Sequence, residues 1–358
     1  MRSPVAQGRI SGRITEIDAF RAWAVLSVLL FHYAKEFYPG QESFFLFGWS
    51  GVDLFFVISG FVMYFQVKRK YVTEEKIFYR KYFRNRFLRI APAFYVSLLA
   101  EVIFLHRDKL FSKEFFMHLS FTHIFSYDVA FSIQPIYWTL AVEVQFYLFL
   151  ILTARLMSGE KALPFLLVLM VLSMSYRFVV SGIYGFSHTG VLLINQLPGR
   201  MPQFISGIFL AMIYMREDLR VLIKKRQSYI FVSGIIIYVA CGLHWLRGGD
   251  GIFDNVFTET IYHPLLGISF AMVMTVILSK EGTLKNTLRF KPLVFAGLIS
   301  YSIYLWHFFL LEVIRFTGMV NTGIPSPVIL VGAIIAVFGI STLSYYCIEK
   351  QFLKLRAR

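Results

Sequence analysis

The strongest constraint on the fold of this chain is a series of apolar blocks, each about twenty residues long. A helix of that length crosses roughly 30 Å, which is the thickness of the hydrocarbon layer of a membrane. Of the 358 residues, 57% are hydrophobic and only 16% are charged, a composition too apolar for a water-soluble domain. We therefore predict an all-α, polytopic membrane protein with about ten transmembrane helices and its functional site inside the helix bundle.

We expect these spans to form a single membrane domain over residues 1–358, because no polar stretch is long enough for a second domain. The basic N-terminus leads into the first span without a cleavage site, so we expect that span to be retained. The predicted spans are 19–37, 48–66, 88–106, 137–156, 163–184, 201–215, 229–247, 257–279, 292–315 and 326–347.

The net charge of +15 fits either nucleic-acid binding or a membrane protein with basic cytoplasmic loops. Lys and Arg in alternate connections divide 27 to 8, with one further Arg inside the first span. Such a division is typical of the positive-inside rule and needs no nucleic acid. We therefore expect no nucleic-acid partner and a multi-pass protein of the cytoplasmic (inner) membrane, with both termini in the cytoplasm.

Two long connections carry amphipathic patterns. Residues 67–87 interleave aromatic and basic side chains, which is typical of a helix lying on the inner membrane surface. The connection 107–136 has a second amphipathic piece around Phe111–Phe125 on the opposite side. Either piece could cover a cavity or lie at the interface.

Ionisable side chains within an apolar span are costly, so each needs a partner or a function. Arg21 and His32 are eleven residues apart, about three helical turns, so they share one face of the first span. The candidates in or beside the spans are Asp18, Arg21, His32, Asp53, Arg86, Arg89, Glu101, Glu143, His307 and Glu312.

Counting from the ends of the spans places these groups in two layers. One layer, in the outer half of the membrane, holds His32, Asp53, Glu143 and His307. The other, near the inner surface, holds Arg21, Arg86 and Arg89, and Asp18 lies three residues before Arg21 and can pair with it.

Structural roles compete for several of these residues. A single His or Glu in a membrane often only bonds one helix to another, and Asp53 follows Gly51 where it could cap a helix. Arg86 and Arg89 could be positive-inside anchors, and Glu101 and Glu312 fit structural positions best.

The layered arrangement suits transfer of an acyl group to a hydroxyl. Such a reaction needs a base for the hydroxyl proton, for which His is well suited. A carboxylate such as Glu143 could orient the imidazole or hold the acceptor. Arg pairs bind the phosphates of an acyl-CoA through charge-assisted hydrogen bonds. A proton-coupled transporter or flippase of glycans would use His and Glu as proton relays, and the residues alone leave both functions open.

Five segments, in order along the chain, resemble the acyltransferase-3 family of bacterial membrane O-acyltransferases. They are Arg21-x10-His32, GWSGVDLFFVISGFVM (48–63), RNRFLRIAPAFY (84–95), YWTLAVEVQFYLF (137–149) and ISYSIYLWH (299–307). The resemblance implies a ten-helix enzyme that transfers an acyl group, most often acetyl from acetyl-CoA, to carbohydrate hydroxyls.

The resemblance also implies roles for individual residues. His32 is the implied catalytic histidine, assisted by Glu143, while Arg21, Arg86 and Arg89 meet the donor. Asp53, Tyr301, Ser302 and His307 are the further residues expected to bind donor or acceptor, the role of His307 being open.

We expect the partners to be acyl-CoA as donor substrate, a carbohydrate acceptor and the lipid bilayer, with no permanently bound cofactor and no metal. Some members of the family append an SGNH-type domain, and we expect none here because the sequence stops soon after the last span.

Overall fold

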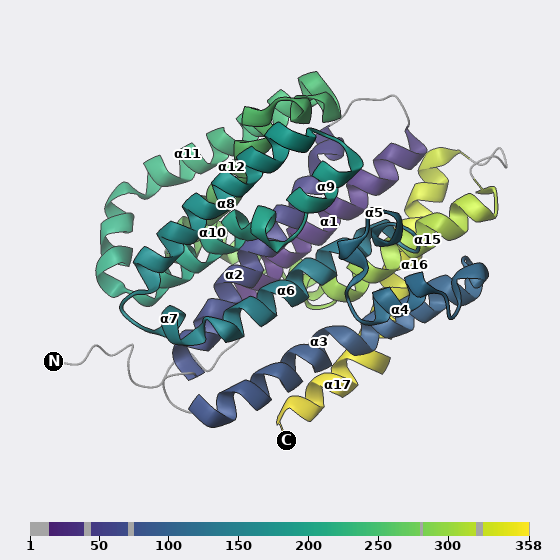
Figure 1. Cartoon of the computed structure of the whole chain (residues 1–358), viewed down its shortest axis with the longest axis horizontal. Helices are drawn as coiled ribbons and strands as arrows, with labels where there is room; N and C mark the ends of the chain where they lie inside the picture. The colour runs from purple at the N-terminus through teal and green to yellow at the C-terminus, as the bar shows by residue number, and fades with distance from the viewer. Residues whose placement is uncertain (1–13, 39–43, 71–74, 280–281, 320–324, 358) are drawn as a thin grey trace.

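The computed structural model describes residues 14–38, 44–70, 75–279, 282–319 and 325–357, and within these ranges the regular structure is helical, with no strand. The long helices run roughly parallel to one another and form a bundle (Figure 1). This confirms the predicted all-α class.

The helices fall into long and short elements. The long ones are α1 (Thr15–Phe37), α2 (Gly51–Lys70), α3 (Glu75–Phe104), α6 (Trp138–Leu152), α8 (Ala162–Tyr184), α10 (Leu197–Met215), α11 (Glu217–Gly248), α12 (Val256–Ser279), α15 (Ser300–Phe316) and α16 (Ser326–Ser344). The short ones are η2 (Phe44–Ser50), η3 (Arg107–Lys109), α4 (Lys113–Leu119), η4 (His123–Phe125), α5 (Tyr127–Ala130), η5 (Pro135–Tyr137), α7 (Ala154–Ser158), α9 (His188–Ile194), η6 (Gly249–Asp254), α13 (Thr283–Leu288), α14 (Lys291–Leu298), η8 (Tyr345–Glu349), α17 (Lys350–Lys354) and η9 (Leu355–Ala357).

Eight of the described helices are long and apolar enough to cross a membrane. A ninth crossing results if α14 and α15, which meet at 71°, form one broken span where the sequence predicts a continuous helix over 292–315. The predicted span 201–215 falls on α10, whose polar residues are buried inside the bundle instead of facing outward. Each of the ten predicted spans thus coincides with a helix or with the bent pair of helices. The chain is a multi-pass membrane protein.

The centre of the bundle depends on close contact between α2 and α10. A Cβ atom on Gly207 would lie 1.9 Å from the backbone oxygen of Val57, and one on Gly60 would lie 2.1 Å from that of Phe204. Small residues let membrane helices approach this closely, so glycine is required at both positions. By contrast, only 22% of the most apolar stretch of α8, and the same share of that of α11, is buried. These helices turn Leu, Val and Phe side chains outward, as suits contact with lipid.

The described parts of residues 67–87 belong to two long helices instead of forming a helix of their own. Helix α2 continues to Lys70 and α3 runs without interruption from Glu75 to Phe104, so the basic residues extend two long helices. The amphipathic piece around Phe111–Phe125 does form short helices, α4 and η4.

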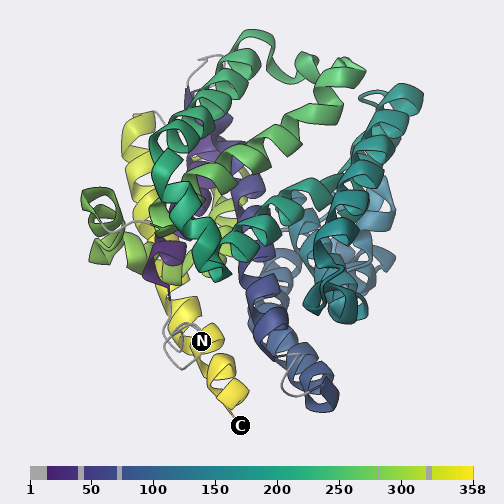
Figure 2. The same ribbon diagram turned by 90° about the vertical axis from the view of Figure 1, so that its left-hand side faces the viewer.

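The start of α1 and the end of the chain lie at the same end of the bundle. Arg89 lines a cavity with Arg21 of α1 and also forms an ion pair of 3.3 Å with Glu349, which precedes α17. In the perpendicular view the first turns of α3 and the last helix α17 project together from this end (Figure 2). The start of α1 and the last described helices therefore lie on one side of the bundle.

Candidate active site

The first of two adjoining cavities, the arginine cavity, has a volume of about 110 Å³. It contains the three arginines that the sequence predicts to lie together, and they come from α1 and α3. Its polar lining is Arg21, Ser59, Arg86, Arg89, Thr139, Glu143, Tyr147, Ser300, Tyr301 and Tyr304.

Each arginine of this cavity is held by a neighbouring side chain. Arg21 pairs with Asp18 at 3.2 Å, as its spacing predicts, and Arg86 donates to Gln66 Oε1 at 2.7 Å. Arg89 pairs with Glu349, which also accepts a hydrogen bond from Ser302. Three guanidinium groups converge on one small cavity, and their charge-assisted hydrogen-bond donors suit an anionic ligand even though carboxylates hold two of them.

Two tyrosines flank the arginines of α3. The guanidinium carbon of Arg86 lies 5.5 Å from the ring centre of Tyr147, and that of Arg89 lies 5.8 Å from Tyr301. The Tyr301 hydroxyl donates to the backbone oxygen of Ile90 at 2.8 Å, which fixes its ring. Such stacking orients the guanidinium planes without neutralising their charge.

The structure groups Glu143 with the arginines and not with His32. Its carboxylate accepts hydrogen bonds from the Ser59 hydroxyl at 2.8 Å and from the Tyr147 hydroxyl. Counting residues from a predicted membrane surface gave the depth of Glu143 but not the direction of its side chain. In the structure the Glu143 side chain lines the arginine cavity. The expectation that Glu143 orients His32 is therefore corrected.

The second cavity, the histidine cavity, has a volume of about 190 Å³. Its walls combine aromatic rings with charged and titratable groups, as is usual where a polar ligand binds between hydrophobic surfaces. It is lined by Val28, Phe31, His32, Trp49, Val52, Asp53, Phe131, Pro135, Ile136, Trp138, Arg200, His263 and Tyr304.

Asp53 is the centre of a polar network in this cavity. Its buried carboxylate lies 3.0 Å from Nδ1 of His263, accepts from Gln203 at 2.8 Å and pairs with Arg200 at 3.6 Å. These partners come from α10 and α12, so Asp53 links helices as well as occupying the first turn of α2. The guanidinium of Arg200 also lies over the Trp138 ring, 5.3 Å from its centre.

The sequence interpretation missed Arg200 and His263. His263 lies within the predicted span 257–279 and met the criterion used for the other candidates, an ionisable group inside an apolar block. Arg200 immediately precedes the predicted span 201–215, where it was counted as a loop residue.

His32 and His307 meet across α1 and α15, with His32 Nδ1 and His307 Nε2 3.2 Å apart. Nδ1 of His307 lies 2.8 Å from the backbone oxygen of Tyr304, and a carbonyl can only accept, so this nitrogen carries the proton. Nε2 of a neutral His307 is then an acceptor, and Nδ1 of His32 must donate to it. His32 Nδ1 also lies 3.0 Å from the backbone oxygen of Val28, which requires the same assignment.

This chain of hydrogen bonds leaves Nε2 of His32 unprotonated. An imidazole nitrogen with a free lone pair can accept a proton from a hydroxyl, which is the task of a general base. His32 lines the histidine cavity, and the Tyr33 hydroxyl next to it donates to the backbone oxygen of His307 at 3.0 Å. The geometry therefore holds His32 in the tautomer that base catalysis requires.

The two cavities share part of their walls. Val52 and Tyr304 line both of them, and the Tyr304 hydroxyl lies 2.8 Å from that of Thr139. The arginine cavity and the histidine cavity therefore adjoin at Val52 and Tyr304. Glu101 and Glu312 line neither cavity and instead face each other beside His106.

Comparison with known proteins gives an independent line of evidence. Residues 14–346 match the family described as "Acyltransferase domain" (Acyl_transf_3). ORF330 of Acidianus two-tailed virus, an acetyltransferase candidate by its name, is 30% identical and the match covers 85% of both chains.

Two further relatives are the peptidoglycan O-acetyltransferase OatA of Listeria monocytogenes, 26% identical, and the O-acetyltransferase OatA of Staphylococcus aureus, 25% identical. Each match covers 82% of this chain but only 49% of the relative, so the chain corresponds to about half the length of these two proteins. No solved structure matches the chain.

Proposed function

Because this chain belongs to the Acyltransferase domain family, it is an acyltransferase, and we propose that it transfers an acetyl group from acetyl-CoA to a carbohydrate hydroxyl. The names of the two OatA relatives support an O-linked acetyl group, and that of the Listeria relative supports a glycan acceptor. The observation that carries the proposal is the unprotonated Nε2 of His32, held by His307 beside the arginine cavity.

We propose that the arginine cavity receives the donor. Pockets that enclose a drug-sized molecule measure about 300–1,000 Å³, so a cavity of about 110 Å³ holds only part of an acyl-CoA. The phosphates of the donor would bind Arg86 and Arg89 of α3, and the thioester would point toward Tyr304 and His32.

In the histidine cavity, Asp53, Arg200 and the Trp49 and Trp138 rings would hold the acceptor sugar. Aromatic rings pack against the apolar faces of sugars, while charged groups bond to their hydroxyls. Both kinds of group line this cavity, whereas three arginines dominate the other.

The proposed reaction is a direct acyl transfer. Nε2 of His32 takes the proton of the acceptor hydroxyl as its oxygen attacks the thioester carbonyl carbon, and the new C–O bond replaces the C–S bond. The departing CoA sulfur then recovers the proton from His32, so atoms and charge balance. While His32 is an imidazolium, its Nδ1–H donates to His307 Nε2, in the orienting position that Asp occupies in a Ser-His-Asp triad.

We further propose that the chain lies in the cytoplasmic membrane with both termini in the cytoplasm. The 27 to 8 division of basic residues supports this orientation, and the arginine cavity lies at the end of the bundle where α1 begins and α17 is found. Cytoplasmic acyl-CoA would then enter at the arginines, and the acceptor would bind nearer the opposite surface.

The test measures CoA release from acetyl-CoA by the full chain in lipid nanodiscs, with and without soluble peptidoglycan fragments. We expect turnover by the native chain, a loss of about 10²–10⁴-fold in His32→Ala, and little change in the affinity for acetyl-CoA. His244→Ala, which removes an exposed imidazole far along the chain, is the matched control.

Near-native turnover in a folded His32→Ala protein would refute the assignment of the base. Transport of a labelled glycan without CoA release in either protein would instead favour a transporter.

A further inference from the structure

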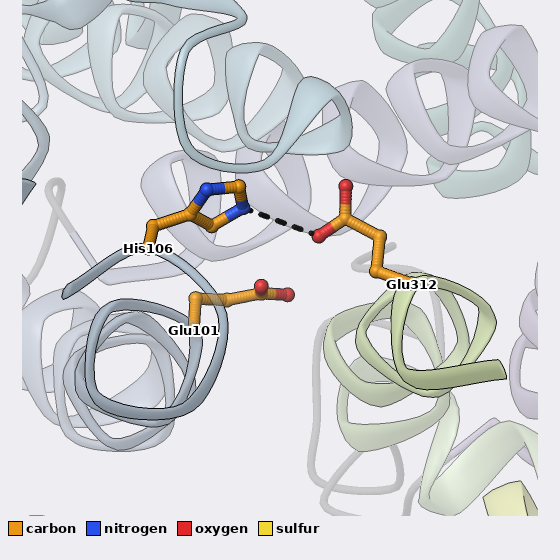
Figure 3. A group of neighbouring side chains, drawn as sticks. All are labelled: Glu101, His106 and Glu312. Atoms are coloured by element: carbon orange, nitrogen blue, oxygen red, sulfur yellow. Dashed lines mark ion pairs between the residues drawn. The ribbon is translucent and has the colours of Figure 1, made fainter. Parts of the chain in front are cut away.

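A second group of titratable side chains lies outside both cavities, where the end of α3 meets α15. Glu101 is near the end of α3, His106 follows that helix, and Glu312 projects from α15 (Figure 3). One possible ligand atom from each residue lies within 4.8 Å of the other two, and His106 Nε2 is 3.5 Å from Glu312 Oε2. The spacing of these residues along the chain matches no metal-binding motif, because the helices bring them together.

Among the described residues no lysine or arginine balances the charges in this group, and His106 is the basic side chain that meets Glu312. The Glu101 side chain is fully buried, and among the described residues its Oε2 atom has no hydrogen-bond partner. Glu312 Oε2 and His106 Nε2 are also buried atoms without a hydrogen bond in that part of the chain. No Lys or Arg in the described ranges pairs with either glutamate, so two carboxyl groups face each other at a cost in desolvation.

Gln134 provides an independent observation at the same place. Its side chain is fully buried and its amide nitrogen donates to Glu101 Oε1. Its amide oxygen is buried and has no hydrogen-bond partner among the described residues. Buried polar atoms almost always have partners. The oxygen atoms of Gln134 and Glu101 that accept no hydrogen bond, beside a Glu312 oxygen that meets only the His106 ring at 3.5 Å, therefore favour a positive group between them.

We propose that Glu101, His106 and Glu312 bind a divalent transition-metal ion, with Zn²⁺ as the best match. Zinc takes imidazole nitrogen and carboxylate oxygen at about 2.0–2.2 Å, whereas Ca²⁺ and Mg²⁺ prefer oxygen ligands alone. Three protein ligands leave a fourth position, which the Gln134 amide or a water molecule would complete.

The ion would join α3 to α15. Arg86 and Arg89 lie on α3, and His307 lies five residues before Glu312 on α15. An ion at this junction would hold the donor-binding helix and the helix of His307 in a fixed relation. Its role is thus structural, and it does not depend on the proposed reaction.

The experiment uses the full chain purified in detergent, stripped with a chelator and then titrated with ZnCl₂. Bound metal is measured by mass spectrometry after gel filtration, and thermal unfolding is followed in parallel. We expect about one Zn²⁺ per chain and a higher Tm in its presence. Glu312→Gln and His106→Asn should each weaken zinc binding at least about 10-fold and remove the Tm increase.

Asp108→Asn is the matched control, since this exposed carboxylate lies two residues from His106 and outside the group. It should bind zinc as the native chain does. If Glu312→Gln fails to fold, His106→Asn still decides, because the His106 side chain is 29% exposed and its loss leaves no large cavity. Zinc binding that persists in His106→Asn, or no stoichiometric binding by the native chain, would overturn the proposal and favour two carboxyl groups sharing a proton.

Discussion

Arg177 is the largest fully buried side chain, and its removal should destabilise the bundle next to the histidine cavity. From α8 its guanidinium donates to the backbone oxygens of Thr260 at 3.0 Å, Gly199 at 2.9 Å and Glu259. It also pairs with the Glu259 carboxylate at 3.3 Å. One side chain thus connects α8, α10 and α12.

The substitution Arg177→Met keeps most of the volume but leaves three carbonyl oxygens and one carboxylate without their donor. Each lost hydrogen bond to a charged group is worth about 1.5–3 kcal/mol, and losing one partner of a buried ion pair costs about 3–5 kcal/mol. Because these losses overlap, we expect the free energy of unfolding to fall by about 3–5 kcal/mol in total. Arg200 directly follows Gly199, and His263 lies about one helical turn after Glu259 and Thr260, so their contacts with Asp53 should also weaken.

The assay is reversible unfolding of the purified chain in mixed detergent and SDS micelles, with Arg315→Met as control. Arg315 pairs with Glu36 at 2.5 Å but is 44% exposed, and exposed ion pairs contribute about 1 kcal/mol or less. If Arg177→Met unfolds within about 1 kcal/mol of the native chain, the bonds from Arg177 do not hold these helices together.

Three further predictions concern the donor site, the orientation in the membrane and the pH dependence of stability. Arg89→Ala should weaken acetyl-CoA binding by about 1.5–3 kcal/mol in a calorimetric titration, and unchanged affinity in the folded protein would make Arg89 an anchor only. A cysteine added at the C-terminus should react with an impermeant thiol reagent only after the membrane is opened, and labelling of intact cells would contradict the proposed orientation. Burial lowers the pKa of His118 to about 4 and of His123 to about 3, from 6.5 in the unfolded chain. Stability should therefore be complete above pH 6.5 and decline as the pH falls toward 4, because the unfolded chain then binds more protons, and the double variant His118→Gln, His123→Gln should show a flatter dependence of Tm on pH.

Much of the fold could be predicted because the hydrocarbon layer imposes a length on each apolar block. That length accounts for α1, α8 and α12, whose bounds agree with the predicted spans to within a few residues. The bend between α14 and α15 was not predicted, because Ser300 and Ser302 interrupt the block too briefly to end its apolar stretch. Continuous hydropathy does not report a change of helix direction.

The candidate site could be predicted as a set of residues but not as a set of contacts. Arg21, Arg86 and Arg89 were grouped correctly. All three lie near the ends of predicted spans on the side of the membrane that carries the basic connections. The bonds from His32 to His307 and from Asp53 to His263 join residues 275 and 210 positions apart. Such pairs depend on how the helices pack, which no local pattern encodes.

The metal-ligand candidates show the same limit. Glu101 and Glu312 have no unusual spacing, so the sequence favoured a structural role and no metal. Only the packing of α3 against α15 brings their carboxylates together with His106. The three-dimensional arrangement, and not the residue types, suggests the site.

The most direct test of the central claim is an experimental structure of the full chain with a non-hydrolysable acetyl-CoA analogue bound. The proposed function predicts phosphate density beside Arg86 and Arg89, with the acetyl group near Tyr304 and within reach of a hydroxyl next to His32. An analogue bound away from the arginine cavity, or an acetyl group separated from His32 by the body of the bundle, would contradict it.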